Sequence, residues 1–166
     1  MDVLVLNCGS SSAKFAVIDP ATSKEEVSGI AQRLGSPDAT LDWKRNGTKE
    51  SRPIPRAGHE VALRAIGTLL NELGLTDELI GVGHRVVHGG SKFSGSMAIT
   101  REVIAKVEEC IPLGPLHNPP NLVGIRIAQE QPLPKWAVTS RWFSGDSPVS
   151  CSACRATKRW LVPWKP

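Results

Sequence analysis

Apolar residues in the first third of the chain fall in short runs separated by polar stretches, a pattern typical of β-strands. Residues 2–6 and 13–18 are apolar and rich in β-branched side chains, and the stretch Asn7–Ser12 between them is rich in residues that favour turns. These two runs therefore predict a β-hairpin. A third strand is predicted over Val27–Leu34.

A second hairpin is predicted around Arg45-Asn46-Gly47. The Asn-Gly pair is a strong signal for a type I′ turn, because both residues tolerate a positive φ. The flanking segments Thr40–Lys44 and Thr48–Pro53 are expected to be its two strands.

Helical periodicity begins after this hairpin. From His59 to Leu73 the apolar residues recur at helical spacing on one face, and Gly74 follows as the expected left-handed stop. The next segment, Leu79–Val87, is predicted to be a buried strand.

Two further helices complete the pattern. One is expected from Thr100, its N-cap, to about Cys110. The other is expected from Asn118, a capping residue followed by Pro119, to about Gln129. Strands followed by a helix, a strand and more helices predict an α/β domain on a mixed sheet, because the strand after the helix needs a crossover connection.

The amino-acid composition of the chain changes near Pro134. The chain has 166 residues and 40% apolar content, which suits one folded domain over residues 1–134. Residues 135–166 are rich in Trp, Ser and Arg without sustained periodicity, and we expect this tail to be poorly ordered. The sequence has no apolar run long enough to span a membrane and no N-terminal signal pattern, so a cytoplasmic location is expected.

The net charge of +4 belongs to the tail. Residues 135–166 hold six Lys or Arg against one Asp, whereas the other 134 residues hold 14 basic and 15 acidic side chains. Nucleic acid is therefore not expected as a partner of the folded part, although a basic Trp-containing tail leaves a membrane surface or RNA open. Cys151 and Cys154 have the spacing of a metal or redox pair, but no second Cys/His pair lies nearby, which favours chance spacing.

The predicted turn Asn7–Ser12 is the first candidate site. A glycine, three hydroxyls and backbone N–H groups in a tight turn suit phosphate oxygens, and Lys14 can add a positive charge. Asn7 supplies a neutral oxygen that suits a metal or its bound water. The spacing is not that of a Walker A loop, and a Ser-rich turn without function is the alternative.

The second candidate is Gly83–Gly90, which reads Gly-His-Arg-Val-Val-His-Gly-Gly. Arg85 at the end of an apolar strand can bind a carboxylate or phosphoryl group bidentately, and Val87 alternates onto the same face. A structural ion pair of Arg85 is the alternative. The third candidate is Pro115–Pro120, where prolines fix the backbone before a helix and give Leu116 and His117 defined directions. His117 can donate to a phosphoryl oxygen, and a histidine of the capping loop without function is the alternative.

At these three sites the sequence resembles the acetate kinase family. Val3–Asp19 is similar to the family's first phosphate hairpin, residues 83–90 to its substrate-arginine segment, and residues 115–121 to a third characteristic stretch. Three motifs in the same order make the resemblance specific, and it covers residues 1–134. It implies a ribonuclease-H-like mixed sheet with flanking helices, the N-terminal domain of the sugar-kinase/Hsp70/actin fold, in truncated form.

The resemblance implies a phosphoryl transfer from ATP to acetate, giving ADP and acetyl phosphate, with Mg²⁺. It also implies that members of the family are homodimers. In the implied site, Asn7 helps to place magnesium, and Ser10, Ser12 and Lys14 lie along the phosphates.

The same resemblance implies the acetate side of the site. Arg85 would hold the carboxylate and the phosphoryl group, Val87 and Leu116 would line the methyl pocket, and His117 would lie near the group that is transferred.

After Pro134 the sequence departs from the family pattern. The family continues with a Phe-Asp-Thr-Ala-Phe-His segment that supplies the catalytic aspartate, and Asp146 has no matching context. We therefore expect the chain as written to be inactive, with most of the dimer surface missing, and we interpret the tail as the product of a frameshift or gene-model error. A noncatalytic phosphate-binding module, an unstable fragment, and a butyrate or propionate kinase relative are the alternatives.

Overall fold

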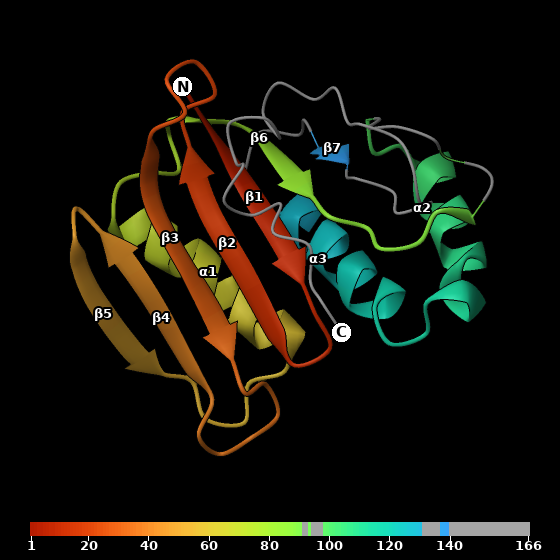
Figure 1. Ribbon diagram of the computed structural model, residues 1–166, viewed down its shortest axis with the longest axis horizontal. Coiled ribbons are helices and arrows are strands. Elements are labelled where there is room, and N and C mark those ends of the chain that lie inside the picture. Colours follow the sequence, from red (N-terminus) through yellow and green to blue (C-terminus); the bar gives the residue numbers. More distant parts are fainter. Residues whose placement is uncertain (91–92, 94–97, 131–136, 140–166) are drawn as a thin grey trace.

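The computed structural model describes residues 1–90, 93, 98–130 and 137–139, which form one mixed sheet with helices packed on it (Figure 1). The sheet has the strand order β5-β4-β3-β2-β1-β6-β7. Its strands are β1 (Asp2–Cys8), β2 (Ser12–Ile18), β3 (Glu25–Gln32), β4 (Thr40–Arg45), β5 (Thr48–Pro53), β6 (Leu79–His84) and β7 (Ala137–Thr139). The helices are α1 (His59–Glu72), α2 (Arg101–Glu109), the short 3-10 helix η2 (Ile111–Leu113) and α3 (Asn118–Glu130).

Connection lengths decide the strand directions. Strands β1 to β5 follow one another through short turns and pair antiparallel. β6 comes after α1 and pairs parallel with β1, and β7 comes after α3 and pairs parallel with β6. This confirms the predicted mixed sheet with flanking helices, because a parallel neighbour requires a helix or another long crossover.

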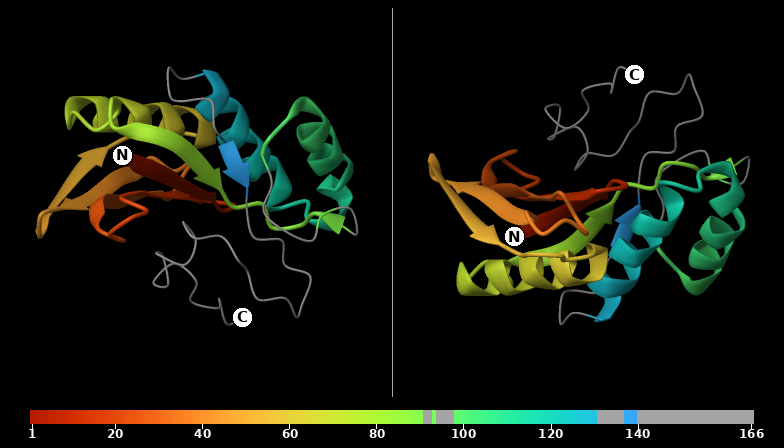
Figure 2. Two further views of the ribbon diagram at one scale, coloured as in Figure 1. Left: turned by 90° about the horizontal axis from the view of Figure 1, so that it is seen from above. Right: turned by 90° about the horizontal axis from the view of Figure 1, so that it is seen from below.

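Helices α1 and α3 cover one face of the sheet, and α2 packs on α3 (Figure 2). The residues that point toward α1 and α3 form a large apolar cluster, to which alternate positions of β1 such as Leu4 and Leu6 belong. A smaller cluster around Val86 and Val107 joins α2, α3 and the segment after β6. In the described part of the chain no helix is long and apolar enough to cross a membrane.

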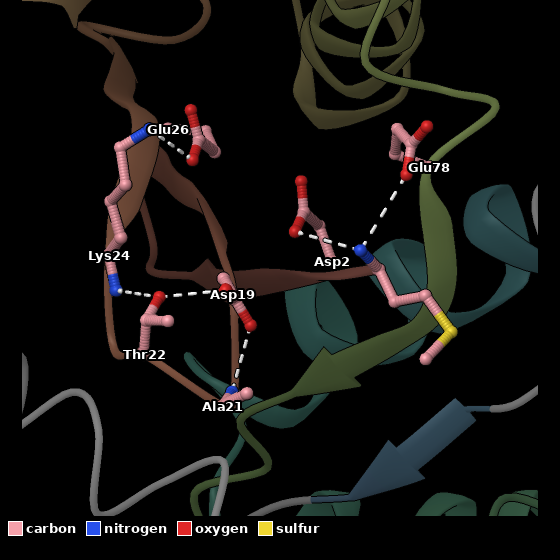
Figure 3. Close-up of polar contacts among 8 residues, drawn as sticks. Asp2, Asp19, Ala21, Thr22, Lys24, Glu26 and Glu78 are labelled. Carbon is pink, nitrogen blue, oxygen red and sulfur yellow. Dashed lines mark hydrogen bonds and ion pairs between the residues drawn. The ribbon is translucent and has the colours of Figure 1, made fainter.

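Short polar side chains close the turns between strands. Between β2 and β3, Asp19 accepts hydrogen bonds from the Thr22 hydroxyl at 2.7 Å and the Ala21 N–H at 2.8 Å, which lower the pKa of Asp19 (Figure 3). Between β4 and β5, Asn46 has φ 50° and Gly47 has φ 85°, both positive as a type I′ turn requires. The predicted Asn-Gly hairpin is confirmed.

The helix predictions are confirmed with small differences at the ends. Helix α1 begins at His59 as expected, and Gly74 follows it with φ 68°. The side chain of Thr100 caps α2 by accepting a hydrogen bond from the Val103 N–H at 3.3 Å. The prediction that Asn118 caps α3 was wrong. Its side chain turns away from the helix end and forms hydrogen bonds with the backbone of the segment after β6.

Strand boundaries differ more from the predictions. β1 extends two residues further than expected, to Cys8, because Cys8 pairs with Ala13 across the hairpin. β3 lies two residues earlier than Val27–Leu34, because Arg33 has φ 56° and interrupts the pairing. β6 ends at His84, three residues before the predicted end at Val87.

The sheet also includes residues beyond position 134. In β7, Ala137 pairs with Val82 and Thr139 with His84. The remainder of the predicted tail, with Cys151 and Cys154, lies outside the described residues. The other two cysteines, Cys8 and Cys110, are buried free thiols.

A buried polar pair lies under α3. His84 is fully buried, and within the described residues its Nε2 has no hydrogen-bond partner; burial lowers its pKa to about 4. Burial also raises the pKa of the Cys8 thiol to about 12. Both groups are therefore neutral at pH 7 and behave as core residues.

Gly124 of α3 lies directly above this pair, and replacing it with Ala is predicted to destabilise the fold. An alanine Cβ would be 2.9 Å from Cys8 Sγ and 3.7 Å from His84 Nδ1. Glycine to alanine inside a helix normally gains about 1 kcal/mol, but overpacking of this size costs about 1–3 kcal/mol. Urea denaturation of Gly124→Ala should show a net loss of stability.

The double variant Cys8→Ala/Gly124→Ala supplies the control. Removing the sulfur removes the crowding, so the alanine at 124 should be far better tolerated in the Cys8→Ala background than in the wild type. Equal effects of Gly124→Ala in both backgrounds would show that the contact with Cys8 is not the cause.

His84 is predicted to make stability depend on pH in the acid range. Its folded pKa of about 4 lies below the unfolded value of 6.5, so the unfolded state binds the proton more readily. Stability is therefore complete above pH 6.5 and falls as the pH decreases toward 4, by up to about 3 kcal/mol. Urea midpoints measured from pH 7.5 to 5 should decrease more steeply for the wild type than for His84→Asn. Parallel pH profiles of the two proteins would contradict this assignment.

Candidate functional site

The sheet brings Asn7 and Lys14 together on one face. The two residues are direct partners across the β1–β2 pair, so their side chains share a face. Leu6 and Cys8, on either side of Asn7, are buried toward the helices, whereas Asn7 is half-buried and Lys14 is exposed. Alternation therefore places Asn7 and Lys14 on the face that the described helices leave uncovered.

Arg85 extends this group from the other side of β1. β6 pairs Leu6 with His84, and one residue further the Arg85 N–H donates to the Leu6 carbonyl oxygen at 3.0 Å. His84 and Val86 are both buried, and Arg85 between them is half-buried. Arg85 therefore alternates onto the same face as Asn7, and the two cationic residues Lys14 and Arg85 flank Asn7 at one end of three adjacent strands.

The turn between β1 and β2 is tighter than the sequence indicated. Only Gly9, Ser10 and Ser11 lie outside the strands, and Ser12 is the first residue of β2. The Gly9 N–H donates to the Ser12 carbonyl oxygen at 2.7 Å, so it closes the turn. Ser10 and Ser11 are exposed, and Ser12 is half-buried. The prediction of a six-residue loop was wrong, because Asn7 and Cys8 pair with β2.

A histidine that sequence reasoning missed supports this turn. Nε2 of His59, the first residue of α1, donates to the Gly9 carbonyl oxygen at 2.7 Å. The contact joins residues 50 positions apart, and the sequence around His59 gives no signal for it.

The third candidate segment is largely open to solvent. Leu116 is 69% exposed and His117 is also exposed. The turn that contains them adjoins the Arg85 segment, since a Cβ on Gly114 would lie 3.5 Å from the Cβ of His88.

The two asparagines of the same segment are buried, and sequence reasoning assigned a role, helix capping, to Asn118 alone. Asn118 is 0% exposed and accepts from the His88 N–H at 3.2 Å. Asn121 is 1% exposed and joins Val87 to Cys8 by hydrogen bonds. The only signal for this buried role in the sequence was the pair of asparagines on either side of Pro119-Pro120. Their spacing does not show which backbone groups the side chains reach.

The described residues contain no group of three or more His, Cys, Asp or Glu side chains that could hold a metal ion. A small apolar crevice lies on the opposite, helix-covered face of β1, and it is lined by Leu4, Leu6, Leu63, Ile66, Gly67, Gly124, Ile127 and Ala128. This crevice has no polar lining group that would orient a charged substrate. The cationic end of β1, β2 and β6 is therefore the candidate site.

Comparisons with known proteins show which family this sequence resembles. The sequence profile of the Acetokinase family matches residues 2–139. An acetate kinase of Deinococcus radiodurans is 47% identical over 130 residues, which are 78% of this chain and 33% of that protein. An acetate kinase of Chromobacterium violaceum is 43% identical over 148 residues, or 88% of this chain and 37% of that protein. The chain thus spans about a third of the length of the curated relatives it matches.

Solved structures give the same result for the fold. The crystal structure of an acetate kinase from Porphyromonas gingivalis superposes with a TM-score of 0.78 and 40% identity, covering 85% of this chain and 37% of that one. A propionate kinase from Francisella tularensis superposes with a TM-score of 0.79 and 35% identity, covering 85% and 36%. Profile, sequence identity and fold agree, and the chain belongs to the acetokinase family.

Proposed function

We propose that this chain supplies the phosphate- and carboxylate-binding half of an acetate kinase site, which transfers the γ-phosphoryl group of ATP to acetate and yields acetyl phosphate and ADP. The main support is the register that sets Lys14 and Arg85 on either side of Asn7 on one face. Substrates of this reaction carry negative charge on both the donor and the acceptor. Two cations at the ends of adjacent strands provide the attraction that such substrates need.

Each of the three residues has a distinct task in this proposal. The guanidinium of Arg85 holds the acetate carboxylate and the phosphoryl group through paired N–H donors. The ammonium of Lys14 lies along the ATP phosphates as a compact positive charge. Asn7, between them, offers an uncharged amide. Phosphoryl transfer depends mainly on alignment and charge neutralisation, so these groups bind and align the substrates, and no nucleophile on the protein is needed.

The hydroxyls and the third segment complete the proposed site. Ser10 and Ser12 donate to phosphate oxygens from either end of the tight turn. Val87 and Leu116 line the methyl side of the acetate, and His117 donates to the phosphoryl group. Because Leu116 is 69% exposed here, a closed methyl pocket requires a further wall from outside the described residues.

Magnesium fits this site only together with the nucleotide. Asn7 contributes one neutral oxygen, and the described residues provide no carboxylate cluster for a metal. Mg²⁺ is commonly held by substrate phosphates, water and one or two protein oxygens, so a single amide is compatible with it. When bound, the ion neutralises phosphate charge. Asn7 would orient it directly or through a water molecule.

The proposed site lacks a counterpart of the family's catalytic aspartate. The printed sequence contains no segment that matches the family's Phe-Asp-Thr-Ala-Phe-His stretch, and we propose that the 166 residues alone bind ligands without turnover. This proposal also includes a cytoplasmic location, the family's homodimer and an atypical tail after a folded domain that extends to β7.

Isothermal calorimetry of the full chain with acetyl phosphate and with ATP–Mg²⁺ tests the proposal. Saturable binding is expected, and Arg85→Ala and Lys14→Ala should each raise the dissociation constant about tenfold or more, because a charge-assisted hydrogen bond contributes about 1.5–3 kcal/mol. Lys49→Ala is the matched control, since Lys49 is an exposed lysine on the edge strand β5.

Two outcomes would contradict the proposal. Absence of saturable binding by a folded wild-type chain would remove it altogether. An equal effect of Lys49→Ala would show that the attraction is due to overall charge. Turnover of ATP and acetate in a coupled assay would contradict only the expected lack of catalysis.

A short-chain acid longer than acetate is the second candidate substrate, favoured by the similarity to the Francisella propionate kinase. One methylene changes binding in an apolar pocket by only about 1–3 kcal/mol. Competition of acetate, propionate and butyrate against acetyl phosphate decides between them. Strongest competition by acetate is expected. Preference for propionate or butyrate would reassign the substrate within the same site.

A further inference from the structure

In the described part of the chain, the segment that follows β6 leaves the strand pairing after Arg85. β6 ends at His84, and Arg85 makes one more ladder bond, from its N–H to Leu6. Val86 is fully buried in the smaller apolar cluster, whereas Val87 and His88 lie beyond the paired residues of β6. Half-buried backbone groups need partners, so Val87 and His88 depend on side chains of another element.

Two buried asparagines of α3 supply these partners. Asn118 accepts from the His88 N–H at 3.2 Å, and its Nδ2 donates at 3.0 Å to both the His88 and Cys110 carbonyl oxygens. Asn121 accepts from the Val87 N–H at 3.1 Å. The amides thus satisfy three backbone groups of residues 87 and 88 that the sheet does not reach.

Asn121 also contacts the strand that leads into the phosphate turn. Its Nδ2 donates to the Cys8 carbonyl oxygen at 2.7 Å. Cys8 follows Asn7 and precedes Gly9, and Val87 lies two residues after Arg85. One side chain therefore connects both halves of the candidate site. Only a group with a donor and an acceptor can bridge a carbonyl and an N–H in this way, and asparagine is such a group.

We propose that Asn121, assisted by Asn118, is a positioning residue that sets the direction of the Arg85 guanidinium relative to the Asn7–Lys14 pair. The inference deepens the proposed function and rests on it for the ligand that Arg85 holds. Binding of a phosphoryl group depends on geometry to within a fraction of an ångström, and buried hydrogen bonds behind a binding residue supply that accuracy. Both asparagines are 1% exposed or less, so they act through the backbone of residues 87 and 88.

The test uses the full chain labelled with ¹⁵N and the variants Asn121→Leu and Asn121→Asp. Asn121→Leu removes both bonds at similar volume and should speed amide exchange of Val87 at least tenfold, broaden the Arg85 Nε–Hε signal, and weaken acetyl phosphate binding about tenfold. Asn121→Asp keeps the acceptor for Val87 and loses the donor to Cys8. In Asn121→Asp the Val87 amide should stay protected from exchange, but acetyl phosphate binding should still weaken. This variant replaces Asn121→Leu in the test if the leucine variant does not fold.

Leu41→Ala is the control for a purely structural role. Leu41 is fully buried in β4, three strands from β1, so its truncation lowers stability without touching residues 85–88. It should leave the Arg85 signal and the dissociation constant unchanged. If it weakens binding as much as Asn121→Leu or Asn121→Asp, the positioning role is wrong.

The readouts separate the two proposals. A wild-type chain that does not bind acetyl phosphate, although Asn121→Leu loosens Val87 and Arg85, would contradict the proposed function and leave the positioning supported. Unchanged Val87 exchange, Arg85 signal and acetyl phosphate binding in the folded Asn121 variants would overturn the positioning role alone.

Discussion

The pairing of β1 on both of its edges is the constraint on which the rest of the structure depends. It pairs antiparallel with β2 and parallel with β6, so one residue of β1 determines which residues of both neighbours share its face. A slip of one residue would turn Asn7 toward the helices and expose the Cys8 thiol. Burial of Leu4, Leu6 and Cys8 against α1 and α3 opposes such a slip, and apolar packing thereby sets the positions of polar residues on the other face.

Helix α3 connects the core to the site. Along its length it contributes Leu122, Ile125 and Ile127 to the apolar clusters, and in its first turn it contributes two buried amides to the segment after β6. Burying an amide is unfavourable unless its donors and acceptors are used, and the bonds to His88, Cys110, Cys8 and Val87 meet that requirement. The helix therefore links the end of β1 with the chain around Arg85.

Family membership and the two cations of the candidate site concern the same part of the chain. The matched region is about a third of the length of its curated relatives, and it contains both cations of the candidate site. Phosphoryl transfer needs positive charge on more than one side of the phosphoryl group that is transferred. We therefore regard this domain as one wall of such a site, with its cations presented on a face that the described helices do not cover.

Local patterns predicted strands β1 to β6 and the three α-helices but not β7, whereas pairing decided where the strands end. The Asn46-Gly47 turn and the start of α1 at His59 needed only neighbouring residues, and both were confirmed. The ends of β1 and β6 depended on partners across the sheet, and both were misplaced. Asn118 was predicted to cap its own helix because capping is the common local use of asparagine, but a backbone segment 30 positions away took its hydrogen bonds.

Fold class, family and the residue types available for phosphate and carboxylate could be inferred before the structure was seen, because periodicity and short motifs are local properties. The tertiary structure alone decided that Lys14 and Arg85 share a face with Asn7, that His59 supports the turn at Gly9, and that Asn121 joins two distant segments. Those relations join residues up to 113 positions apart, and they arise from strand register and core packing, which no single stretch of sequence contains.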